Sequence, residues 1–153
     1  MHEARLAALG ITLPGPFPPH DPLDAVVVHA GTARTSGCLP RDAGGNVRSG
    51  LLGRDVTPAD GAEAAGLCAL NAVSLLRAAL GTLDRIERVL TATVFIACTD
   101  DFVEQPAVAD GASRALDQIF GPAGRHTRSA IGVAALPRGA SVEVELTVAL
   151  AGD

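Results

Sequence analysis

Two acidic residues near the C-terminus fall on one face of an expected strand. The segment ASVEVELTVAL (140–150) alternates apolar and polar residues, as a strand with one buried face does. The polar face carries Glu143, Glu145 and Thr147. Paired acids can carry general acid–base chemistry, or they can keep a strand face soluble. The alternation alone favours the second, structural interpretation.

Arg128 could form a substrate-binding site together with these two acids. It opens the segment TRSAIGVAAL (127–136), which the turn Pro137-Arg138-Gly139 separates from the acidic strand. We expect the two segments to pair as a closing pair of strands, which would bring Arg128 close to the acids. Arginine is planar, always charged and grips a carboxylate through two hydrogen bonds. An arginine, an acid and a small-residue pocket suit a small carboxylate substrate and an activated water.

The remaining candidates have ordinary structural interpretations beside the functional ones. Cys38 follows a Ser-Gly turn and could be a nucleophile, but a free cysteine more commonly behaves as a small buried apolar residue. His126, two residues before Arg128, could shuttle protons or satisfy a backbone group. Cys68 and Cys98 are expected in the core. The chain has no CxxC and no His at ligand spacing, so no metal site is predicted.

Composition excludes several function classes. All 12 basic residues are arginine, and without lysine there is no lysine Schiff base, no lysine-anchored pyridoxal phosphate and no P-loop lysine. A net charge of −5 argues against a large phosphate-binding surface and hence against a nucleic-acid partner. Separated cysteines suggest reduced thiols, and no apolar run approaches the ~20 residues of a membrane span. We therefore predict a cytoplasmic protein without a membrane partner.

The elements predicted from periodicity give an α+β fold. We expect one domain, residues 1–153, in which residues 1–24 form an N-terminal helix and a Pro-rich connector. Thr57 and Pro58 begin a long helix that ends at Gly81. The other expected elements are a helix at 2–9, strands at 24–31 and 32–37, a Gly-rich loop at 41–55, a strand at 87–98, a helix at 104–120 and the two closing strands. The order β-β-α-β-α-β-β predicts a single mixed sheet with both helices on one face.

Three segments together resemble a known family. RSAIGVAALPRGASVEVE (128–145) is similar to the signature of the Rid family of reactive-intermediate deaminases, also called YjgF and long labelled endoribonuclease L-PSP. TSGCLP (35–40) resembles the family's Ser-Gly-Gln-x-Pro segment, and TATVFIACTDDF (91–102) resembles its strand followed by an Asp-Phe turn. The likeness covers about residues 25 to 150. The stretch 109–130 resembles a longer branch of the family.

The resemblance implies a chorismate-mutase-like fold, a homotrimer and active sites in clefts between subunits. It implies hydrolysis of small 2-imino or enamino acids to 2-keto acids and ammonia, without cofactor or metal. Arg128 would hold the substrate carboxylate and Glu143 would position water. The substrate pocket would be lined near Ser36, Cys38 and Ala130. The partners would then be a small carboxylate-bearing imine or keto acid and other copies of the same chain.

Departures from the family pattern leave two alternatives open. The family's deaminases carry a Tyr near the first strand and this chain has none, while its nearest candidate for the family's Asn in the second helix is Asp110. The first alternative is a non-catalytic protein whose cleft binds a keto acid or another small carboxylate. The second is the endoribonuclease activity of the old family label.

Overall fold

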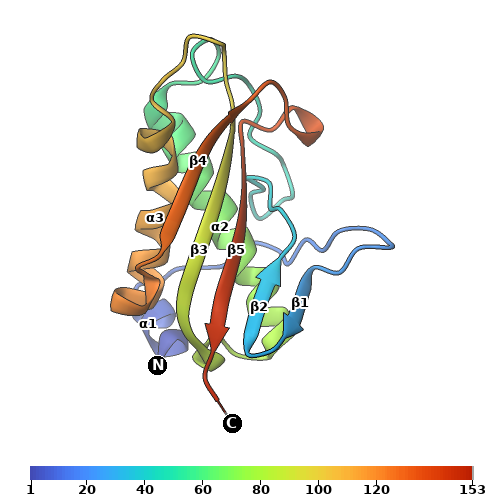
Figure 1. Ribbon diagram of the computed structural model, residues 1–153, viewed down its shortest axis with the longest axis vertical. Coiled ribbons are helices and arrows are strands. Elements are labelled where there is room, and N and C mark those ends of the chain that lie inside the picture. The colour runs from blue at the N-terminus through green and yellow to red at the C-terminus, as the bar shows by residue number, and fades with distance from the viewer. Residues whose placement is uncertain (153) are drawn as a thin grey trace.

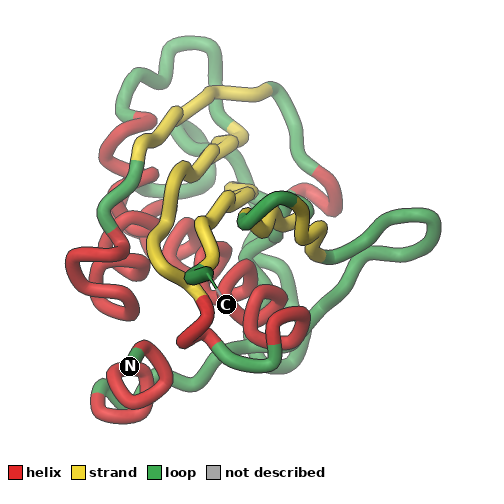
Figure 2. Tube along the Cα trace, turned by 60° about the horizontal axis from the view of Figure 1, so that its bottom comes forward, coloured by secondary structure: helices red, strands yellow, loops and turns green. Residues whose placement is uncertain are grey.

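Five strands form one mixed sheet, and two long helices cover one of its faces (Figure 1). The computed structural model describes residues 1–152. The elements are α1 (His2–Ala8), β1 (Val26–His29), β2 (Thr32–Thr35), α2 (Pro58–Leu80), β3 (Ile86–Ala97), α3 (Gln105–Phe120), β4 (Thr127–Val133) and β5 (Val142–Leu150). Their order confirms the predicted α+β class and the single mixed sheet. Figure 2 shows the helices lying together on one side of the strands.

The last two strands of the chain are not neighbours. The sheet order is β1-β2-β5-β3-β4, so that β3 pairs antiparallel with β5 on one side and parallel with β4 on the other. The predicted closing pair is therefore wrong. Helix α3 connects β3 to β4, and such a crossover places β4 parallel beside β3 at the outer edge. The predicted turn exists as a short 3₁₀ helix (Pro137–Gly139), but it joins strands that β3 separates.

Helix α2 has the ends that its sequence predicts. The Thr57 side chain accepts a hydrogen bond from the Asp60 backbone N–H at 3.1 Å, and Pro58 occupies the first turn. Gly81 ends the helix with a left-handed φ of 80°. Helix α3 packs close against α2 at Gly111, where any side chain would collide with the Ala62 backbone. Small residues therefore set the spacing of the helix layer.

The core lies between the sheet and the helices and consists mainly of Ala, Val, Leu and Ile side chains. On β5, Val142, Val144 and Leu146 are at most 1% exposed and face the helices. The alternation predicted for this strand is confirmed, so Glu143 and Glu145 lie on the opposite, open face of the sheet.

The N-terminal segment runs from the helix layer to the far edge of the sheet. Helix α1 is held by His2, which is buried, bonds through Nε2 to the Ile86 carbonyl at 3.0 Å and packs edge-on against Phe120. The connector then carries Phe17 and His20 to the loop that follows β2. This path brings residues far apart in sequence to one cavity.

Helix α2 also changes one sequence expectation. It is 23 residues long, and its most apolar 18-residue window has a mean hydropathy of 1.3, enough by length and composition to cross a membrane. The expectation that no apolar run approaches that length was therefore too strict. Because 61% of the window is buried inside the protein, the helix has the character of a core helix, which passes the same test.

Candidate functional site

Glu143 is a half-buried carboxylate on the open face of the sheet. Burial, and secondly the negative charge of Glu145, raise the pKa of Glu143 above its usual value. Its carboxylate lies against Gly37, where any side chain would collide with Oε1. Glycine at position 37 thus leaves the space that the acid occupies. A raised pKa makes a carboxylate a stronger base, which suits a group that must accept and return a proton.

A cavity of about 190 Å³ opens beside this acid. The N-terminal connector, the loop after β2, helix α2 and the turn before β5 all contribute to its wall. Six of its lining residues are Phe17, Gly37, Cys38, Arg41, Asn71 and Glu143, and we call this space the Glu143 cavity. It is smaller than the ~300–1,000 Å³ of drug-sized ligand sites, which restricts it to small molecules.

Cys38 lines the Glu143 cavity as a neutral thiol. Burial, and secondly the charge of Glu143, raise its pKa to about 12, although Arg41 acts in the opposite direction. Its Sγ donates to the Ser36 carbonyl at 3.5 Å. A thiol that stays protonated is a poor nucleophile, so the structural interpretation of Cys38 prevails.

Ser36 has its own polar groups occupied. Its hydroxyl donates to the Asp24 carbonyl at 2.7 Å, and its backbone N–H donates to the Ala25 carbonyl at 2.9 Å. The Cys38 backbone N–H and C=O both pair with Val144. These groups hold the loop against β1 and β5 and shape the wall of the cavity.

Arg128 lies on the other side of the sheet. It is in register with Ala92, which faces the core, and its side chain runs along helix α3. Nη1 donates to Asp110 Oδ1 at 2.8 Å and to Ser113 Oγ at 3.1 Å. The Arg128 side chain is 22% exposed, so the guanidinium is partly shielded where it pairs with Asp110. Ala130 follows on the same face and packs against the core.

A histidine completes the surroundings of Arg128. His126 Nδ1 bonds to the Gly124 carbonyl at 2.5 Å, and His126 Nε2 lies 3.0 Å from Ser113 Oγ. With Nδ1 donating to the carbonyl, Nε2 accepts the Ser113 hydroxyl proton, and Ser113 Oγ accepts from Arg128. We call Asp110, Ser113, His126 and Arg128 the Arg128 cluster. A hollow of about 600 Å³ opens beside it.

The structure therefore separates the two principal predicted residues within one chain. β3 lies between their strands, Glu143 is on the open face, and Arg128 and Ala130 are on the helix-covered face. Because β4 and β5 are not neighbours in the sheet, Arg128 and Glu143 do not meet through the strand pairing that was predicted from the sequence. Sequence reasoning considered Asp110 and His126 but missed Ser113. Its position three residues after Asp110, on the same helix face, was the available signal.

The comparisons with known proteins agree with this fold. The family described as "YjgF/chorismate_mutase-like, putative endoribonuclease" matches residues 3–150. The chain belongs to the Rid/YjgF family. Protein TCP17 of Trypanosoma cruzi is 43% identical over 148 residues, which are 96% of this chain and 92% of that protein.

Two solved structures are similar to this Rid/YjgF chain over almost its whole length. The protein Atu1372 of Agrobacterium tumefaciens is 39% identical with a TM-score of 0.89, and the match covers 98% of this chain and 94% of that one. A "putative endoribonuclease" of Shewanella oneidensis MR-1 is 32% identical with a TM-score of 0.93, covering 98% and 99%. The α+β fold with one mixed sheet is thus the family fold, chorismate-mutase-like as the resemblance implied.

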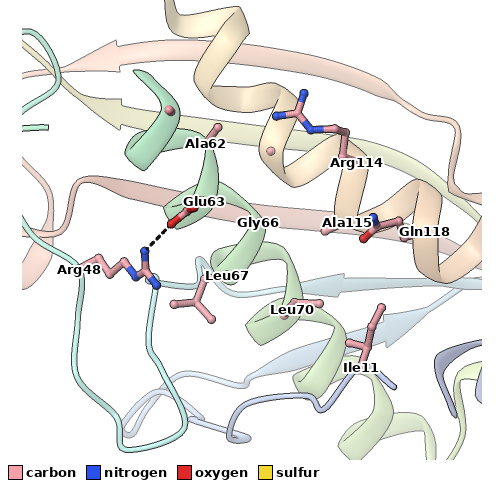
Figure 3. A pocket seen from close by; sticks show the side chains of 12 residues that line it. Ile11, Arg48, Ala62, Glu63, Gly66, Leu67, Leu70, Arg114, Ala115 and Gln118 are labelled. Atoms are coloured by element: carbon pink, nitrogen blue, oxygen red, sulfur yellow. Dashed lines mark hydrogen bonds and ion pairs between the residues drawn. The ribbon is translucent and has the colours of Figure 1, made fainter. Parts of the chain in front are cut away.

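A third hollow in this Rid/YjgF chain contains neither key residue. The groove between α2 and α3 measures about 620 Å³ and has an apolar floor that includes Leu67, Leu70 and Ala115 (Figure 3). An exposed pair of Arg48 with Glu63, 3.2 Å apart, lies at its rim. Within residues 1–152, no group of three or more His, Cys, Asp or Glu side chains is arranged to hold a metal ion.

Proposed function

We propose that the protein hydrolyses small 2-imino or enamino acids to 2-keto acids and ammonia. The observation that carries the proposal is the half-buried Glu143 carboxylate, with its raised pKa, beside a cavity sized for a small molecule. The family membership supports it, and so does the resemblance of residues 128–145 to the signature of the family's deaminases.

Glu143 has the properties that the chemistry needs. A water attacks the carbon of the protonated imine while Glu143 accepts the proton that the water loses. Glu143 then returns this proton to the nitrogen and takes the hydroxyl proton as the carbon–nitrogen bond breaks. The carbonyl forms and ammonia leaves. Ammonia takes the proton that Glu143 holds, so ammonium is released and the Glu143 carboxylate is restored. The steps form one carbon–oxygen bond, break one carbon–nitrogen bond and move protons, and none of them oxidises or reduces the substrate.

The proposal places the site between subunits of a homotrimer. On the open face of the sheet, Val27 and Ile131 are 54% and 40% exposed, and Ile131 lies in one cross-strand row with Phe95 and Glu143. Exposed apolar side chains on a sheet face favour burial against a second copy. A neighbouring copy that covers this face would bring its own Arg128 cluster to Glu143, where Arg128 would hold the substrate carboxylate.

The test is release of keto acid and ammonia from imines generated in place by an amino-acid oxidase. Wild-type protein should accelerate release, and Glu143→Gln should lower the accelerated rate by about 10²–10⁴-fold while keto-acid binding changes little. If the wild type binds a keto acid but does not accelerate the reaction, the protein is a carboxylate-binding protein and not an enzyme. Equal loss of binding and turnover in Glu143→Gln would make this acid structural.

The family description supplies a second candidate, endoribonuclease activity. The net charge of −5 and the absence of lysine weigh against it, because RNA affinity depends largely on contacts to phosphate. RNA cleavage that Glu143→Gln and Arg128→Ala both abolish would favour this candidate. Cleavage that survives both changes would point to a contaminant or to another site.

A further inference from the structure

Arg41 is an arginine that lines the Glu143 cavity. Its guanidinium carbon lies 5.5 Å from the centre of the Phe17 ring. Among residues 1–152 the guanidinium forms no ion pair and donates no hydrogen bond. Arg41 is only partly exposed, and it lines the same cavity as Glu143. A shielded cation without an acidic partner is an arrangement that an anionic ligand would complete.

The surroundings of Arg41 hold it in place and leave its hydrogen-bond donors available. The contact with Phe17 is one between a cation and an aromatic ring, which uses none of the guanidinium N–H groups as hydrogen-bond donors to a described oxygen. Asn71 on helix α2 donates from Nδ2 to the Arg41 carbonyl at 2.9 Å and so fixes the backbone. Asn71 is 4% exposed and lines the cavity, and its Oδ1 is buried without a partner, an acceptor that a donor inside the cavity would satisfy.

Glu143 does not use the charge of Arg41. No ion pair joins them, and the raised pKa of Glu143 follows from burial and from Glu145, with no lowering by Arg41. Both charges do act on the Cys38 thiol, which lies in the wall that they share. The cavity therefore presents a proton-accepting acid and, separately, an unneutralised guanidinium.

We infer that Arg41 selects substrates whose side chain ends in a second carboxylate, so that the preferred imines are those of dicarboxylic amino acids. The inference rests on the proposed function. The substrate's first carboxylate is held by Arg128 of a neighbouring copy, its imine carbon faces Glu143, and its second carboxylate meets the in-plane donors of Arg41. A cavity of about 190 Å³ is of a size that suits a small dicarboxylic acid.

The turnover experiment compares imines generated from glutamate and from norvaline, which have five carbons each and differ in the terminal carboxylate. Wild-type protein should have a kcat/KM at least about tenfold higher for the glutamate imine, as expected for a charged hydrogen-bonded pair. Arg41→Met, which keeps an unbranched side chain but removes the guanidinium, should reduce that ratio at least about tenfold. The matched control is Arg48→Met, outside the cavity, which should keep the wild-type ratio.

A binding experiment separates the failure of this inference from the failure of the proposed function. Calorimetry compares 2-oxoglutarate with 2-oxopentanoate on the wild type and on Arg41→Met. If no imine is hydrolysed but the wild type prefers 2-oxoglutarate and Arg41→Met loses that preference, the inference stands and the deaminase proposal fails. Equal affinities for the two acids in the wild type, or a preference that Arg41→Met retains, would overturn the role of Arg41.

Discussion

The key charged residues on the two faces of the sheet, Arg128 and Glu143, have opposite surroundings. On the helix-covered side, Arg128 is paired by Asp110 and by Ser113, which His126 in turn orients. On the open side, Glu143 has neighbours that disfavour its ionised form, namely the surrounding protein and Glu145. One region is a preorganised cation and the other is an acid disposed to take up a proton. Under the proposed function these two regions are half-sites that complement each other across a subunit boundary.

Among changes on the helix-covered side, Arg128→Lys should have the largest effect. An ammonium keeps the charge but loses the planar two-point grip, and its donors, all on one nitrogen, do not span Asp110, Ser113 and a substrate carboxylate. We expect keto-acid binding and imine hydrolysis to fall by at least about tenfold, nearly as far as in Arg128→Ala. Calorimetry and the imine assay measure both. Near wild-type keto-acid affinity and imine hydrolysis in Arg128→Lys would show that Arg128 only stabilises the packing of α3.

Gly37→Ala tests the space beside Glu143. The added methyl group would collide with the carboxylate, which must then swing out of its half-buried position. We expect turnover to fall by about tenfold or more through loss of positioning, while the melting temperature changes little, since Gly37 is exposed. Unchanged kcat in a folded variant would mean that the position of this carboxylate does not matter for catalysis.

Much of the fold could be predicted from the sequence because its signals are local. Thr57-Pro58 and Gly81 define the ends of α2, and the alternation of β5 places Glu143 and Glu145 on one face. The neighbour of β4 could not be predicted in the same way. A tight Pro-Arg-Gly turn suggests a hairpin, and only the packing of α3 across the sheet places β3 between β4 and β5.

The candidate site was predicted in part. Glu143 was identified from its strand position and Arg128 from its motif, but the raised pKa of Glu143 depends on tertiary burial that no local pattern contains. Arg41 belongs to a Gly-rich loop and meets Phe17 only because the connector crosses the sheet edge. Contacts between segments so distant in sequence carry no periodic signal.

Ser113→Ala tests the support of Arg128. The variant removes one acceptor from the guanidinium and the partner of His126 Nε2, yet it keeps the pair with Asp110. We therefore expect a few-fold rise in KM with kcat largely retained, because substrate orientation loosens while Glu143 is untouched. A fall in kcat with unchanged KM would instead assign Ser113 to the chemical step.

The smallest expected effect is a pH shift in Glu145→Gln. Burial is the larger cause of the raised pKa of Glu143 and stays, but removal of the neighbouring charge lowers that pKa. Glu143 must be ionised to accept a proton, so the acid limb of the kcat/KM profile should move to lower pH. The lost pair of Arg34 with Glu145 is exposed and should cost less than about 1 kcal/mol. If the acid limb of the kcat/KM profile does not move, the titrating group that causes it is not Glu143.

Complementation between two inactive variants tests the central claim most directly. Glu143→Gln and Arg128→Ala are mixed one to one, unfolded together and refolded, with each variant refolded alone as the control. If one subunit supplies Glu143 and its neighbour supplies Arg128, random assembly restores wild-type sites and returns about a quarter of wild-type activity. Assembly into mixed oligomers without any recovery of activity would contradict a site shared between subunits.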